Sequence, residues 1–133
     1  AAALSLGGVR ISRAPLFTAF AGMGQLIGRL GLFTLSELSL WKAKRRHFRV
    51  PDHFEGIVAG EAVHEGHFLH ILKDLRPGTT EVMMHPGTDN EKLIPACDWE
   101  HDFEAEMQAI VSPKVRRMIA DKAVKVVNYR DLK

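Results

Sequence analysis

The 133-residue sequence contains a single cysteine, Cys97, so no disulfide can form within the chain. Internal disulfides are typical of secreted proteins, and their absence is typical of a cytosolic one. Cys97 is also a weak candidate for a nucleophile, because the neighbouring carboxylate of Asp98 disfavours the thiolate that would attack a substrate. We therefore expect a cytoplasmic protein whose chemistry does not use its cysteine.

Neither the charge nor the hydropathy of the chain indicates a nucleic acid or a membrane as partner. The formal net charge is only +2, which is too small to favour binding to a phosphate backbone. No uncharged apolar run is long enough to span a membrane, and the N-terminus lacks the basic-then-apolar order of a signal peptide. The one strongly basic run, Lys42–Arg49, is typical of a solvated helix end, with phosphate or anionic-surface binding as the alternative.

The order of the predicted elements indicates the α/β class. With 46% hydrophobic residues the chain can bury one core, and strands that alternate with helices imply a mostly parallel sheet. Four strands cannot close an eight-stranded barrel, so we expect a single α/β domain over residues 1–133 or half of a barrel. The predicted strands are 9–12, 50–60, 80–85 and 124–128, and the predicted helices are 15–44, 61–75, one from 98 and one from 113.

Two clusters in the first half of the chain suggest a ligand site but are better explained by structure. The glycines of Gly22–Gly28 lack the spacing of a dinucleotide fingerprint, and they predict close helix packing or a break before a helix restarts at Thr34–Trp41, with Ser36 as its cap. His64, His67 and His70 fan around the predicted helix instead of converging, so we expect no metal there.

The most informative segment is Gly78–Gly87, a turn and short strand that ends in His85-Pro86-Gly87. Alternation places Glu81 and His85 on the same face of this strand. Pro86 restricts the backbone of His85 to extended conformations, and the C-terminal rim of a parallel sheet is where α/β folds place their chemistry. His85 is therefore a candidate catalytic residue, with a turn histidine as the alternative.

The same segment and four others resemble the YdjC-like carbohydrate deacetylases, which include the chitooligosaccharide deacetylases and a branch of hopanoid biosynthesis. The resemblance extends over roughly residues 8 to 132. It is most specific in the strand that ends in His-Pro-Gly. The segments that carry it are Asp52–Ile57, Leu75–Gly87, Glu104–Ile110, Ser112–Val115 and Val126–Leu132.

The resemblance implies a distorted (β/α) barrel and a metal-dependent hydrolysis of the N-acetyl group of N-acetylated sugars. In that family a divalent metal, Mg or Zn, is held by an aspartate of an early Asp-Asp motif and by two histidines of the N-terminal half. This sequence has no Asp-Asp pair, and no histidine precedes His47. It opens at Ala1 without a methionine, as a processed product or a fragment would. We therefore expect the C-terminal half of such an enzyme, without metal ligands of its own.

Hydrolysis of an amide at a metal also needs an acid for the leaving amine, and a rim histidine suits that role. His85 is accordingly the predicted catalytic residue. Arg10, Arg13 and Glu81 are candidate substrate contacts, although salt bridges explain all three as well. The alternative function is a non-catalytic α/β binding module. We expect the exposed face of a half-barrel to be covered in a homo-oligomer or by an N-terminal segment missing from this sequence.

Overall fold

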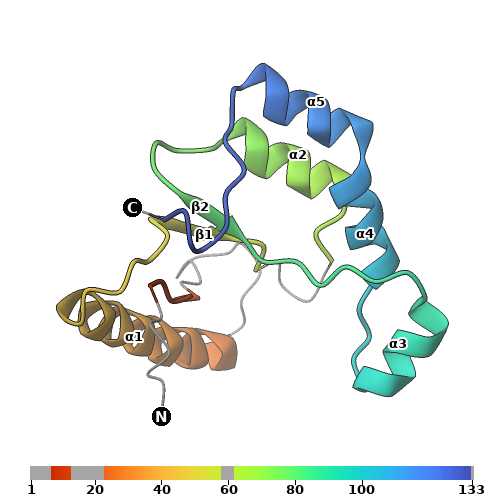
Figure 1. Ribbon diagram of the computed structural model, residues 1–133. Helices are drawn as coiled ribbons and strands as arrows, with labels where there is room; N and C mark the ends of the chain where they lie inside the picture. The colour runs from red at the N-terminus through yellow and green to blue at the C-terminus, as the bar shows by residue number, and fades with distance from the viewer. Residues whose placement is uncertain (1–6, 13–22, 58–61, 133) are drawn as a thin grey trace, which may run out of the picture. The chain divides into compact units, whose positions relative to one another are not determined.

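The computed structural model describes residues 7–12, 23–57 and 62–132, and within the first helix it describes side chains from Thr34 onward (Figure 1). The chain divides into two compact units, which are described separately. The first unit comprises Ala1–Phe54, Gly78–Glu81 and Val127–Lys133. The second comprises Glu55–Pro77 and Val82–Val126.

Helix α1, Met23–Arg45, is the longest element of the first unit. It continues through the glycines at which we predicted a break, so the expected restart at Thr34 is wrong. Ser36 does not cap a helix; its hydroxyl donates a hydrogen bond to the carbonyl of Ser12 at 2.9 Å. The last turn carries Lys42, Lys44 and Arg45, whose charges interact favourably with the negative end of the helix dipole.

Two short strands, β1 (His53–Glu55) and β2 (Thr80–Val82), pair in parallel as a two-stranded sheet. Both fall inside predicted strands but are shorter. The predicted strand at 9–12 is wrong, because only an isolated parallel bridge joins Gly8 to Arg49. The predicted strand at 124–128 is wrong as well, since that segment pairs with no strand among the described residues. The described residues thus form a partial α/β fold of five helices and two strands.

Three helices of the second unit, α2 (Glu65–Lys73), α4 (Phe103–Val111) and α5 (Pro113–Asp121), pack on one another, as Figure 1 shows. The starts of α2 and α5 are joined, because the carboxylate of Glu65 accepts hydrogen bonds from the Ser112 hydroxyl at 2.6 Å and from Lys114 at 2.9 Å. Ser112 caps α5 and Pro113 is its first residue, as predicted. The buried apolar side chains of this unit are Val63, Leu72, Phe103, Ala109 and Val115.

Helix α3, Asn90–Cys97, occupies a stretch that we predicted as a loop, and it contacts α4. Its last residue, Cys97, is exposed. The chain then reverses at Asp98, whose φ of 48° lies in the left-handed region. The predicted helix from residue 98 therefore begins only at Phe103. None of the described helices is long and apolar enough to cross a membrane.

Candidate functional site

The His85-Pro86-Gly87 element follows β2 after two intervening residues, and the second unit holds its backbone at both ends. The amide of His85 donates a hydrogen bond to the carboxylate of Glu106. The amide of Gly87 donates to the carbonyl of Phe103 at 2.9 Å. A Cβ at Gly87 would lie 2.3 Å from Leu93 Cδ1 and 2.9 Å from Phe103 Cβ, so only glycine allows this approach.

Glu106 is the buried anchor of this element. It lies on α4, and only 1% of its surface is exposed. One carboxylate oxygen accepts the amide of Val63 at 2.9 Å and the other accepts the amide of His85. A buried carboxylate is costly unless such donors satisfy it. The side chain of Glu106 therefore joins α4 to the segment before α2 and to the backbone of His85.

His85 belongs to a cluster of four rings, together with Trp99, His101 and Phe103. Trp99 and His101 are stacked, with centroids 4.1 Å apart and planes 21° apart. The ring of His85 stands nearly perpendicular to both, 5.1 Å from Trp99 and 5.4 Å from His101. Phe103 completes the group at 4.9 Å from His101. The side chain of His85 is nevertheless 39% exposed, so its backbone is fixed while its imidazole is accessible.

His85, His101 and Glu106 together could hold a divalent metal, because one ligand atom from each lies within 4.8 Å of the others. Glu106 Oε1 lies 3.2 Å from His101 Nε2, and Oε2 lies 4.0 Å from His85 Nδ1. His101 Nε2 is buried and has no hydrogen-bond partner of acceptable geometry. A buried ring nitrogen without such a partner is available as a ligand, so the three residues fit a metal. Two imidazoles favour zinc over magnesium, which prefers oxygen ligands.

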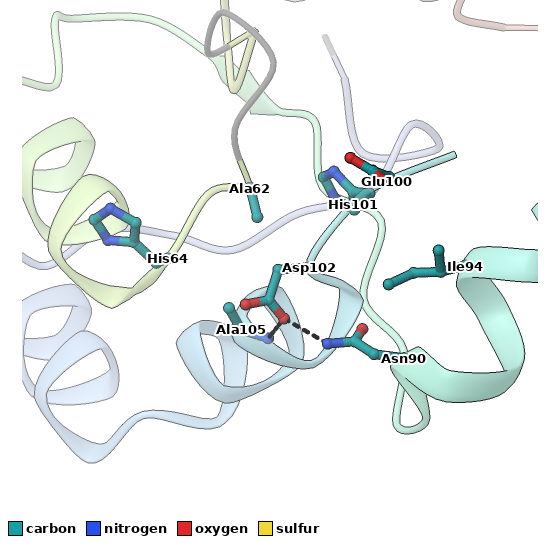
Figure 2. A pocket seen from close by; sticks show the side chains of 8 residues that line it. All are labelled: Ala62, His64, Asn90, Ile94, Glu100, His101, Asp102 and Ala105. Atoms are coloured by element: carbon teal, nitrogen blue, oxygen red, sulfur yellow. Dashed lines mark hydrogen bonds between the residues drawn. The ribbon is translucent and has the colours of Figure 1, made fainter. Parts of the chain in front are cut away.

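An open pocket of about 620 Å³ lies beside His101 (Figure 2). Asp102 caps α4 within it and accepts hydrogen bonds from the Asn90 amide at 2.8 Å and from the backbone of Ala105 at 2.9 Å. Both hydrogen bonds lower the pKa of Asp102, and the bond from Asn90 has the larger effect. Asp102 is thus an ionised structural cap. The pocket is lined by Ala62, His64, Asn90, Ile94, Glu100, His101, Asp102 and Ala105.

Glu81 and Arg10, predicted as substrate contacts, form an ion pair in the first unit. The carboxylate of Glu81 also accepts a hydrogen bond from the hydroxyl of Tyr129. Burial and this bond raise the pKa of Tyr129 to about 12. Burial alone would lower the pKa of Arg10, but the hydrogen bond and the charge of Glu81 raise it above its ordinary value. Arg13 lies outside the described residues.

The three histidines near α2 serve its ends. His64 is the N-cap of α2 rather than a helical residue, and its ring stacks on that of His67 at 4.3 Å, so the predicted divergence of these two rings is wrong. His70 pairs with Asp74 at 3.4 Å near the end of the helix. Among the described residues, the three do not form a group that could hold a metal.

Sequence reasoning missed Trp99, His101 and Glu106. The predicted helix from residue 98 would have included Trp99, whereas this residue is 43% exposed and lies outside the helix. The buried face of α4 is formed by Phe103, Glu106 and Ala109. A hydrophobic pattern does not identify the charged Glu106 as a buried residue. The one available signal was that the Glu104–Ile110 segment contributes to the family resemblance.

The comparisons with known proteins agree with this resemblance. The sequence matches the YdjC-like protein family over residues 1–121. The chain belongs to this family. It is also 29% identical over 82 residues to a carbohydrate deacetylase of Thermoanaerobacter pseudethanolicus (strain ATCC 33223 / 39E), a match that covers 62% of this chain and 33% of the relative. The chain thus spans about a third of the length of this relative. No solved structure matches it.

Proposed function

We propose that this YdjC-like chain is part of a metal-dependent carbohydrate deacetylase, which hydrolyses the N-acetyl group of N-acetylated sugars. The family and the relative named a carbohydrate deacetylase support the reaction class. The observation that carries the proposal is the state of His85. Its backbone amide is fixed by a buried carboxylate, while its imidazole is 39% exposed beside a tryptophan.

In the proposed reaction the oxygen of a water molecule attacks the amide carbonyl, and the bond between that carbon and the sugar nitrogen then breaks. The leaving amine must take up a proton, which the imidazolium of His85 donates, and the proton that the attacking water gives up as the acetate forms restores the imidazolium. Histidine suits this step because an imidazole both gives up and takes up a proton readily under physiological conditions. Glu106 acts as a positioning residue, since its hydrogen bond fixes the backbone from which the imidazole projects.

Of the three predicted substrate contacts, Arg10 and Arg13 remain part of the proposal, whereas a structural role is favoured for Glu81. Both oxygens of Glu81 already accept hydrogen bonds, from Arg10 and Tyr129, which favours a structural role for Glu81. Arg10 donates to Glu81 through Nε, and its side chain is 52% exposed. Its guanidinium carries further N–H groups of the kind that bind sugar hydroxyls. Arg13 remains a proposed substrate contact on sequence grounds only.

A second role for His85 follows from the arrangement with His101 and Glu106. These three residues would hold a divalent metal, which supplies Lewis-acid polarisation of the amide carbonyl when bound. The two roles exclude each other at the ligating nitrogen, because a nitrogen that binds a metal cannot donate a proton. We favour the proton donor, since the imidazole of His85 is 39% exposed and accessible to a substrate.

Zinc titration by calorimetry separates the two roles. Should His85 be a ligand, the protein would bind one equivalent of zinc, and His101→Gln would abolish that binding. The triple variant His64→Gln, His67→Gln, His70→Gln is the matched control and would keep it. Our proposal predicts instead that His101→Gln leaves the zinc content unchanged.

The function itself is tested by release of acetate from an N-acetylglucosamine oligomer by the complete enzyme, of which this chain is the proposed part. His85→Ala should lower kcat about 10²- to 10⁴-fold with a smaller change in KM. His70→Ala is the control, because His70 is exposed and pairs with Asp74 at the end of α2, in a role that we do not link to the reaction. A protein that binds the oligomer but releases no acetate would instead support the alternative, a non-catalytic binding module.

A further inference from the structure

Trp99 is an exposed aromatic side chain held in one place. It follows the reversal at Asp98, and its backbone amide donates to the carbonyl of Ile94 at 3.4 Å. Its ring contacts those of His101, His85 and Phe103, yet 43% of the residue is exposed. An ordered aromatic surface in contact with water is typical of a binding site, since no ordering has to occur when the ligand binds.

The ring geometry shows which surface of Trp99 is open. His101 covers one face, because the two rings are stacked 4.1 Å apart. His85 lies 5.1 Å from Trp99 and 5.4 Å from His101. A ring almost equally distant from both members of a stack lies beside the stack and not over its outer face. Phe103, at 5.7 Å and 4.9 Å from the same two rings, also lies beside it. The outer face of Trp99 is therefore left uncovered by these rings.

The surroundings of this face indicate the class of ligand. A pyranose ring presents apolar C–H groups on its faces and hydroxyl groups at its edges. The open face of Trp99 matches the first, and His85 at its edge offers a polar group to the second. Glu100 and His101, the next two residues, line the pocket of Figure 2 together with Asn90. An apolar aromatic surface with a few polar groups around it is the usual composition of a small-molecule site.

We propose that the outer face of Trp99 is a stacking platform for one pyranose unit of the N-acetylated sugar, placed so that its acetamido group lies beside His85. This inference rests on the proposed function for the identity of the sugar. The other exposed tryptophan, Trp41, belongs to the first unit, where the guanidinium of Arg45 lies 4.6 Å from the centre of its ring. Trp41 is therefore the matched control.

The test uses the fluorescence of the two tryptophans in the sequence, with the N-acetylglucosamine trimer as the probe. In Trp41→Phe the signal comes from Trp99 alone, and addition of the trimer should change it saturably. In Trp99→Phe the remaining signal should not respond. Calorimetry should give a dissociation constant about tenfold higher for Trp99→Ala than for wild type. The dissociation constant of Trp41→Ala should equal that of wild type, and that of Trp99→Phe should lie between those of wild type and Trp99→Ala.

Equal affinity of Trp99→Ala and wild type would overturn the platform, and so would a response confined to Trp41 or no binding of the trimer to wild type. Circular dichroism of Trp99→Phe, which keeps an aromatic ring, verifies that the fold is retained. Acetate release distinguishes failure of the proposed function from failure of the platform. Binding that depends on Trp99 without acetate release would refute the hydrolysis and retain the platform, whereas acetate release with an unchanged KM in Trp99→Ala would refute the platform alone.

Discussion

Replacement of Glu106 by glutamine should destabilise the second unit although it hardly changes the shape of the side chain. The carboxylate accepts the amides of Val63 and His85, one on each oxygen, and is 1% exposed. Hydrogen bonds to a charged group contribute about 1.5–3 kcal/mol each. Glutamine keeps one acceptor oxygen and turns its NH₂ group towards the other amide, so one of the two bonds is lost and one buried donor is left unsatisfied.

We therefore expect Glu106→Gln to lower the free energy of unfolding by about 2–3 kcal/mol. Glu106→Ala, which loses both bonds and leaves a cavity, should lower it by about 4 kcal/mol. Urea unfolding followed by helical circular dichroism, with a common m value, measures both. Glu104→Gln is the control on the same helix. Its exposed carboxylate accepts only the amide of Asn90 at 3.2 Å, and its cost should stay within about 0.5 kcal/mol. Equal costs for Glu104→Gln and Glu106→Gln would refute the anchoring role of Glu106.

Two further predictions concern the first unit. The pKa of Tyr129 is raised to about 12, so its contribution to stability should be fully present below about pH 10, its ordinary pKa, and should be lost as the pH rises towards about 12. Tyrosinate absorbance measures the titration of this residue alone, since the sequence has one tyrosine. A titration midpoint near 10 would contradict the burial of Tyr129 beside Glu81. On α1, Leu35, Leu38 and Trp41 are 62%, 55% and 54% exposed, and we expect a second copy of the chain to cover them. Light scattering should then show dissociation on Leu38→Lys, and a stable wild-type monomer of 14.9 kDa at high dilution would count against this interface.

The local signals in the sequence gave correct predictions, whereas the signals that depend on distant partners did not. Ser112-Pro113 starts α5 as expected, because a cap depends on adjacent residues only. Val124–Asn128 has the composition of a strand but lacks a partner in the described residues, and pairing cannot be read from a single segment. Helix α3 was missed because Pro95 lies within it, and proline usually ends a helix.

The same contrast between local signals and distant partners holds for the candidate site. His85 was predicted from its own strand, proline and glycine, and it does lie in a fixed element beside other functional groups. Its neighbours come from residues 99–106, and the reversal at Asp98 that brings Trp99 and His101 to it depends on a left-handed aspartate. No periodicity predicts such a residue. The set His85, His101 and Glu106 was therefore not predicted, and we had expected no metal ligands in the chain.

The central claim, that His85 delivers the proton to the leaving amine, is tested most directly by the pH dependence of kcat for deacetylation of an N-acetylglucosamine oligomer. Wild type and His85→Ala are compared side by side from about pH 5 to about pH 9, a range that spans the titration of histidine. The account predicts that wild-type activity falls on the basic side as the imidazolium loses its proton. The variant should be about 10²-fold or more slower and should lack that limb. Equal rates and the same basic limb in both proteins would contradict the account and reduce His85 to a turn residue.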